Sequence, residues 1–181
     1  SIHTALKEAG IIPDPCVGRN DTAAERRSYQ RWYVTRTFYY DGTMSSPLLS
    51  FKGVANKCRV FVNGVPVAEH EGMFGGPDIA VDKYLKRGEN VIKVELLPIL
   101  EIYNGGWPAT ANEAWKHTVV SNCVYGWHYS KIPSMGIWND VHLVDRPDLR
   151  IENPFFITRS VKGDMRMQLT LPKETTGEIR L

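Results

Sequence analysis

The dipeptide Asn63-Gly64 is the feature that most constrains the fold of this chain, because it stands between two segments that read as β-strands. In residues 57–62 every second residue is apolar, a period of two that is typical of a strand with one buried face. Asn-Gly tolerates the positive φ values of a type I′ turn. The sequence therefore predicts a β-hairpin over residues 59–67.

Other segments repeat this strand pattern or mark turns. Residues 4–9 can form about two turns of helix ended by Gly10, and Asp82 can cap a single helical turn that ends before Gly88. The chain also holds 15 Gly, 11 Pro, 5 Trp, 8 Tyr and 6 Phe, which suits many turns and strands. We expect further strands in residues 48–54, 90–97, 118–125 and 137–144. This pattern predicts an all-β domain, a β-sandwich or jelly roll with one short N-terminal helix.

A domain boundary is expected at Pro147, because proline cannot continue a central strand. Residues 1–147 would form the first domain. Residues 148–181 hold a second hairpin-like pair, 155–161 and 165–171, and then begin a third strand. An immunoglobulin-like sandwich needs about 100 residues and seven strands, so this part is predicted to be the truncated start of one. Its outward apolar residues leave a homodimer through this end as a possibility.

Amino-acid composition restricts the classes of binding partner of this chain more than it restricts its cellular compartment. The formal net charge is only +2, which disfavours nucleic acid and anionic membranes and favours a neutral ligand. No apolar run reaches the roughly 18 residues of a membrane-spanning helix. The 3 cysteines are far apart and the first residues lack a signal-peptide pattern. Localisation stays open, with a periplasmic or secreted parent protein favoured over a cytoplasmic one.

Motifs for catalysis are largely missing. His70 lies between Glu69 and Glu71, a cluster that could bind a metal or move protons. No second His or Cys stands at ligand spacing from it, so a solvated turn without metal is the favoured interpretation. Neither a GxSxG nucleophile motif nor a phosphate-binding glycine motif is present. We therefore assign no catalytic residue, metal or cofactor to this chain.

The phrase YGWHY offers a binding site instead, because Trp127, His128 and Tyr129 follow one another beside a glycine. In a loop, such rings can stack on the apolar face of a sugar while polar groups bind its hydroxyls. Trp107, in the long connection 98–116, is a further candidate. The alternative is that these rings pack in the core, and Trp138, which alternates with core positions, is assigned to packing.

Three segments in order carry a family resemblance: FKGVANKCRVFVNGVPVAEHEG, DIAVDKYLKRGENVIKVEL and GIWNDVHLVDRP. Over residues 48–147 their order and spacing resemble the amino-terminal sugar-binding, galactose-binding-like domain of family 2 glycoside hydrolases. The opening HTALKEAGIIPDPCVGRND and the phrase YGWHY resemble the β-mannosidase branch more specifically. Departures from the family pattern include Asn139 in place of an Arg and Glu71-Gly72-Met73 in place of H-x-G-G.

The resemblance implies a jelly-roll domain, then an immunoglobulin-like domain, then a C-terminal TIM barrel that carries both catalytic glutamates of a retaining exo-glycosidase. This chain alone would be inactive and would help to shape the pocket for a terminal β-linked sugar. Trp127 matches the first Trp of the branch's G-W-D-W phrase, whereas His128 replaces its Asp, which puts mannoside specificity in doubt. An autonomous carbohydrate-binding module and a purely structural support domain remain the alternatives.

Overall fold

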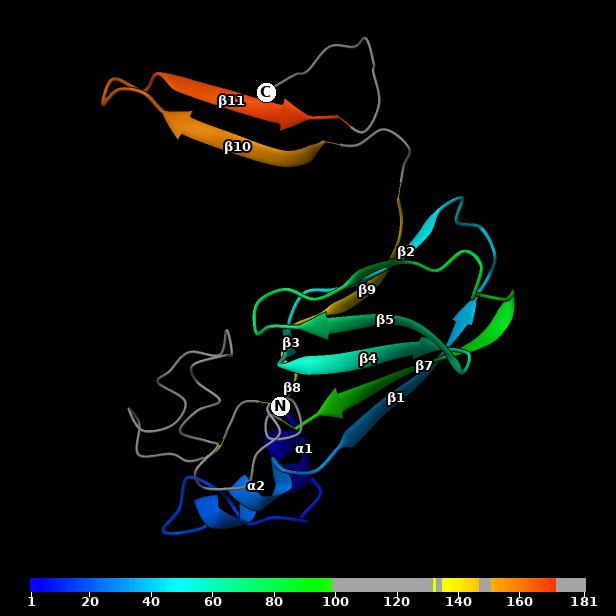
Figure 1. Ribbon diagram of the computed structural model, residues 1–181, viewed down its shortest axis with the longest axis vertical. Coiled ribbons are helices and arrows are strands. Elements are labelled where there is room, and N and C mark those ends of the chain that lie inside the picture. Colours follow the sequence, from blue (N-terminus) through cyan, green and yellow to red (C-terminus); the bar gives the residue numbers. More distant parts are fainter. Residues whose placement is uncertain (99–131, 133–134, 147–150, 172–181) are drawn as a thin grey trace. The chain divides into compact units, whose positions relative to one another are not determined.

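The computed structural model shown in Figure 1 describes residues 1–98, 132, 135–146 and 151–171. The chain divides into two units, Ser1–Val144 and Asp145–Leu181. The first unit contains two helices, α1 (Ile2–Glu8) and α2 (Asp21–Arg27). Its strands are β1 (Trp32–Tyr40), β2 (Pro47–Phe51), β3 (Val54–Ala55), β4 (Lys57–Val62), β5 (Val65–Glu71), β6 (Asp78–Ala80), β7 (Gly88–Leu97), β8 (Gly136–Ile137) and β9 (Val141–Asp145), the last of which runs one residue into the second unit. None of the described helices is long and apolar enough to cross a membrane.

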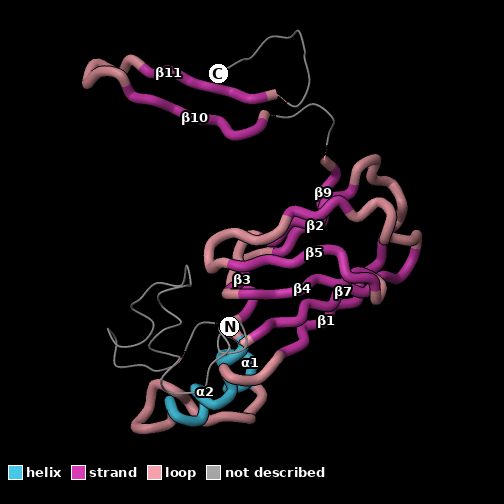
Figure 2. Tube along the Cα trace, viewed as in Figure 1, coloured by secondary structure: helices cyan, strands magenta, loops and turns pink. Residues whose placement is uncertain are grey.

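Two main sheets build the first unit (Figure 2). One has four strands in the order β1-β7-β4-β5, with antiparallel pairing throughout. The other has three strands in the order β6-β2-β9, and β3 pairs with β8 in a short ladder beside them. The expected all-β class is therefore confirmed.

The hairpin predicted around Asn63-Gly64 is confirmed as β4 and β5. Asn63 has φ 50° and Gly64 has φ 85°, the positive values that a type I′ turn requires. Nδ2 of the Asn63 side chain donates to the Tyr84 carbonyl and to Oδ1 of Asn90, at 2.8 Å each. The turn residue thus also fixes the loop that leads into β7.

That loop is organised by Asn90, which is fully buried. Its Oδ1 accepts from the Lys86 backbone at 2.9 Å, and its Nδ2 donates to the carbonyls of Lys86 and Gly88 at 2.7 and 2.9 Å. A buried amide with all these partners stabilises a turn that lacks a regular ladder. The single helical turn expected after Asp82 appears here as bonds to the Val81 carbonyl.

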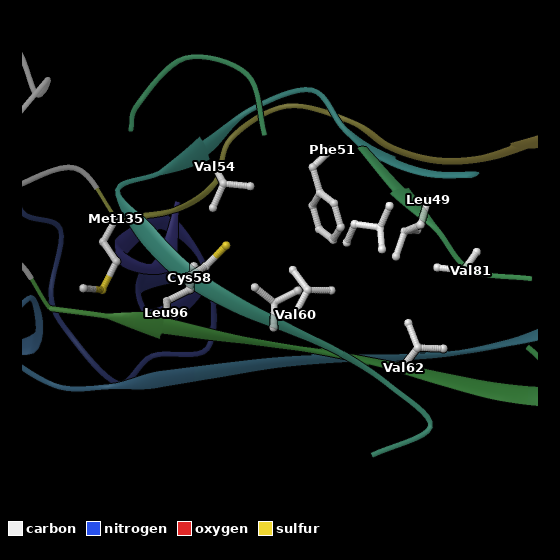
Figure 3. Packing of buried hydrophobic residues seen from close by; sticks show 11 residues of the cluster. Leu49, Phe51, Val54, Cys58, Val60, Val62, Val81, Leu96 and Met135 are labelled. Atoms are coloured by element: carbon white, nitrogen blue, oxygen red, sulfur yellow. The ribbon is translucent and has the colours of Figure 1, made fainter. Parts of the chain in front are cut away.

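The core lies between the two sheets, as Figure 3 shows. The alternate residues of β4 point inward and are completely buried, which explains why the period of two was readable in the sequence. The cluster consists of Leu49, Phe51, Val54, Cys58, Val60, Val62, Ile79, Val81, Val94, Leu96 and Met135. Burial of this apolar surface is the main force that holds the sheets together.

Several sequence-based expectations need correction or extension. Helix α1 is present, with Ser1 as its N-cap and Gly10 at φ 71° after its end. Helix α2 and the nine-residue strand β1 were not predicted. The continuous strand expected over residues 137–144 is wrong, because the chain bends between β8 and β9. The expected strand 118–125 and connection 98–116 fall almost entirely outside the described residues, with Pro98 alone described.

The second unit contains the antiparallel hairpin of β10 (Glu152–Thr158) and β11 (Met165–Thr170), as expected. Its turn is closed by a backbone bond from Arg159 to Asp164 at 2.7 Å. Phe155, Phe156 and Met165 are 60%, 56% and 67% exposed, so this hairpin presents large apolar side chains.

Candidate functional site

The candidate sugar-binding residues Trp107, Trp127, His128 and Tyr129 lie outside the described residues. The structure does place both ends of the segment that contains them. Strand β7 ends at Leu97, which pairs with Lys57 at the start of β4. The chain re-enters at β8, which pairs with β3, directly before β4 in sequence. Both ends of the segment therefore lie at one end of the sandwich, the end that also holds the N-terminus (Figure 1).

The re-entry point is firmly anchored. Met135 is 3% exposed and belongs to the core, and its carbonyl accepts from the Ile2 backbone nitrogen at 3.1 Å. Gly136 has φ 135°, and a Cβ there would lie only 3.2 Å from Cα of Ser1. A glycine is thus required by both the backbone conformation and the close approach of the N-terminus.

The N-terminal segment packs around this anchor as a small second cluster. Leu6, Ile12 and Ala24 form its buried centre, with Ile132 packed against them. Nε2 of His3 lies 2.8 Å from Oγ of Ser28, and burial lowers the pKa of this imidazole below its usual value. The two helices and the residues just before β8 therefore form one packed body, although they are far apart in the sequence.

Trp138 lies in the bend between β8 and β9. Its Nε1 donates to the Met73 carbonyl at 2.9 Å, and its backbone nitrogen donates to the Gly53 carbonyl at 3.1 Å. A Cβ at Gly53 would lie 2.6 Å from Cε2 of the indole, so the ring sits directly against this glycine. Trp138 is nevertheless 47% exposed. Its assignment to core packing is therefore only half right, and its partners could not be found from local sequence.

Three described carboxylates, those of Glu69, Glu71 and Glu95, are engaged in ion pairs. Glu69 binds Nε of Arg59 at 2.8 Å and Glu71 binds Nζ of Lys57 at 3.2 Å, and both carboxylates are at least half exposed. The buried Glu95 is also paired, with Nη1 of Arg59 at 3.7 Å. Each of these three carboxylates therefore has a basic partner.

The expectation of a solvated turn at His70 is wrong. His70 lies within β5 opposite Cys58, and its Nε2 is buried without a hydrogen-bond partner among the described residues. Those residues contain no group of three potential metal ligands. Burial raises the pKa of the Cys58 thiol to about 12, which makes it a core residue and not a nucleophile.

A cavity of about 780 Å³ lies between the sheets in the described part of the first unit. Every residue from Asn139 to Leu143 lines it, so it follows the backbone of β9, the last strand of its sheet. Across from β9 it is lined by β1, the end strand of the other sheet. A space along two strand edges suits an extended chain segment better than a small ring. The cavity as a whole is therefore not assigned to the sugar, although two of its lining residues, Asn139 and Asp140, directly follow Trp138 in the chain.

Comparison with known proteins gives relatives of consistent kind. Beta-mannosidase B of Thermothelomyces thermophilus is 22% identical over 156 residues, which are 79% of this chain and 18% of the relative. A crystal structure of Beta-D-Mannosidase from Dictyoglomus thermophilum matches with TM-score 0.78 and 24% identity, covering 92% of this chain and 22% of that one. The exo-chitosanase CsxA of Amycolatopsis orientalis matches with TM-score 0.64 and 21% identity, covering 86% of this chain and 17% of that one.

The solved structures establish the shared fold, and this chain spans only about a fifth of each relative's length. Residues 1–139 match the family described as "Glycosyl hydrolase 2 galactose-binding domain-like". That match includes the two helices, the hairpin, the anchor at Met135 and the ring of Trp138. The chain therefore belongs to the glycosyl hydrolase 2 galactose-binding domain-like family, as the sequence resemblance predicted.

Proposed function

We propose that this chain is the non-catalytic sugar-binding domain of a family 2-like retaining exo-glycosidase. In this proposal it helps to shape the pocket for a terminal β-linked sugar, while a C-terminal TIM barrel of the same parent chain supplies both catalytic glutamates. The family match over residues 1–139 supports this role, and two of the three relatives named above are β-mannosidases. A β-mannoside is therefore the first substrate class to test.

The observation that carries the proposal is the anchor at Met135 and Gly136. A loop that contributes to a sugar pocket must be held in place, because a displaced contact loses most of its value in the transition state. Residues 126–131 are followed closely by Ile132 and Met135, which pack into two different clusters. The segment that carries Trp127 and His128 is thus followed closely by residues whose positions are fixed by packing.

The engaged carboxylates support the non-catalytic part of the proposal. Retaining glycosidases need two carboxyl groups about 5–5.5 Å apart, one acting as acid and base and the other as nucleophile. Glu69 and Glu71 are neighbours on one strand, but each is bound to its own cation and exposed. The chemistry is therefore assigned to the barrel and not to this domain.

For the second unit we propose the start of an immunoglobulin-like domain, with the boundary near Pro147. Phe156 and Met165, both exposed, lie on one face of the hairpin, which the rest of such a domain would cover, whereas Phe155 lies on the opposite face. The alternative is that a second copy of the chain covers these exposed residues. Size-exclusion chromatography with light scattering distinguishes these two possibilities. If the rest of the immunoglobulin-like domain covers the exposed residues, the longer parent chain should be monomeric and the present chain should not.

The test of the proposed function uses the full-length parent enzyme. Trp127→Ala should cost about 1–3 kcal/mol of transition-state binding, a fall of roughly 5- to 150-fold in kcat/KM on aryl glycosides. His128→Asp should raise activity on β-mannosides relative to other sugars. Tyr39→Ala, at a 74% exposed ring of β1, is the control and should leave kcat/KM unchanged.

Unchanged kinetics in a folded Trp127→Ala enzyme would refute the pocket role. A loss of thermal stability alone would instead favour a structural support domain. Sugar binding by the isolated chain, with no effect on the parent's kinetics, would favour an autonomous carbohydrate-binding module.

A further inference from the structure

Trp138 combines two properties that rarely occur together: it is 47% exposed, and its orientation is fixed. An exposed tryptophan without a role is free to change rotamer, whereas this indole uses its only polar atom to bind the Met73 carbonyl at 2.9 Å. Gly53 removes the side chain that would push the ring away, since a Cβ there would lie within 2.8 Å of both Cε2 and Cζ2. The fold therefore positions a ring that it does not bury.

The backbone around the ring is equally fixed. The Lys52 nitrogen donates to the Asp140 carbonyl at 2.9 Å, and the Val54 nitrogen donates to the Gly75 carbonyl at 3.0 Å. Together with the bond from Trp138 to Gly53, these bonds join three segments that are distant in sequence. A preorganised ring binds a ligand without the entropic cost of ordering it.

The surroundings of the ring supply both apolar surface and hydrogen-bonding groups. Phe74, next to the residue that Trp138 binds, is 74% exposed. Asp140, two residues along the chain, has a side chain that is 79% exposed and lies 3.9 Å from Nε2 of His142. Asn139 uses its Oδ1 on the Asp140 backbone nitrogen at 2.9 Å, and its side-chain NH₂ group makes no bond in the described part.

This mixture favours a sugar over a protein as the ligand. The cores of protein interfaces are depleted of charged residues, whereas Asp140 and His142 lie close to this ring in the chain. A pyranose presents an apolar C–H face to an aromatic ring and hydroxyls at its rim, which carboxylate, amide and imidazole groups bind. The position also fits, since Trp138 follows β8 at the end of the sandwich where the segment 99–131 leaves and returns.

We propose that Trp138 is a carbohydrate-stacking platform that binds the C–H face of a pyranose, with polar contacts from Asn139 or Asp140. This inference rests on the proposed sugar-binding role of the domain and adds to it a position beyond the loop 126–131. It gives the bend between β8 and β9 a function, because a straight strand would not turn this ring onto Gly53.

The test is ¹⁹F NMR of the present chain labelled with 5-fluorotryptophan, which gives one signal for each of the 5 tryptophans. Trp138→Phe and Trp127→Phe identify two of the signals. Methyl β-D-mannopyranoside is added up to about 50 mM, well above a Kd of about 1 mM. Sorbitol, which has hydroxyls but no ring face, is the matched control for the ligand.

We expect the Trp138 signal to move in a saturable way with the mannoside and not with sorbitol. Gly53→Ala, which keeps the indole but displaces it, should raise the Kd about 2- to 12-fold. Tyr39→Ala should leave the Kd unchanged. If only the Trp127 signal moves, the platform is wrong and the proposed function stands. If no signal moves, or if the Trp138 signal changes with protein concentration alone, the platform is also wrong, and the kinetics of the parent enzyme still decide the proposed function.

Discussion

The contact between Gly53 and Trp138 gives a prediction whose size follows from the geometry. In Gly53→Ala the new Cβ would lie 2.6 Å from Cε2 of the ring, whereas ordinary contacts begin at 3.4 Å, so the indole must retreat by about 0.8 Å. If the indole moves away from the Met73 carbonyl, its 2.9 Å bond from Nε1 lengthens to about 3.7 Å, beyond hydrogen-bond range. Overpacking costs about 1–3 kcal/mol and the lost hydrogen bond about 0.5–1.5 kcal/mol. We therefore expect a loss of roughly 1.5–4.5 kcal/mol, or about 3–18 °C in Tm.

Urea denaturation of the single and double variants with Trp138→Ala measures the coupling between the two residues. Removing the indole should lower the cost of Gly53→Ala by about 0.5–3 kcal/mol but not abolish it, because the new Cβ would still lie 2.9 Å from Cβ of Asn139. Gly76→Ala is a matched control, because its Cβ would meet Phe51 at 2.6 Å and not Trp138. Its cost should be the same in both backgrounds. A Gly53→Ala variant as stable as the parent, or an equal cost with and without the indole, would refute the described packing.

Three further predictions concern single groups and the chain as a whole. Burial raises the pKa of the Cys58 thiol to about 12. In a Cys123→Ser chain, Cys58 should therefore react with Ellman's reagent only on unfolding, while the exposed Cys16 reacts at once. Fast labelling of both thiols would contradict this. Burial lowers the pKa of His3, so the unfolded chain binds the proton more readily and the free energy of unfolding should fall as pH drops below 6.5. His3→Gln should flatten that pH dependence, and an unchanged profile would rule out His3 as its source. The chain alone should not hydrolyse any p-nitrophenyl glycoside, and turnover that survives removal of contaminants and is lost on mutation of Glu69 and Glu71 would overturn the non-catalytic role.

Local chemistry explains which parts of the fold could be predicted. The hairpin of β4 and β5 depends on a two-residue turn and an alternation within ten residues, and both are visible in sequence. Strand β1 was not predicted from its sequence. Large rings occur on both of its faces, Tyr33 and Tyr39 on the outer one, so the alternation of Trp32, Val34 and Phe38 does not stand out. Its ladder with β7 joins residues such as Trp32 and Leu96, which no local pattern reveals.

Helix α2 and the surroundings of Trp138 also could not be predicted from local sequence. Helix α2 begins after Asn20, a favourable N-cap residue, but it has a single buried apolar residue, Ala24, and so lacks the apolar stripe that marks a helix in sequence. The role of Trp138 depends on Gly53 and on Met73, which is 65 residues away. The family resemblance, by contrast, could be identified from the sequence because it depends on the order of several local motifs.

The proposed role of this domain is to line the sugar pocket of a larger glycosidase. The most direct measurement is a crystal structure of the full-length parent enzyme, with its acid–base glutamate changed to Gln, bound to an aryl β-mannoside. We predict that the sugar in the barrel lies within about 4.5 Å of the Trp127 ring. A sugar bound in the barrel with no atom of residues 1–181 in contact would contradict it.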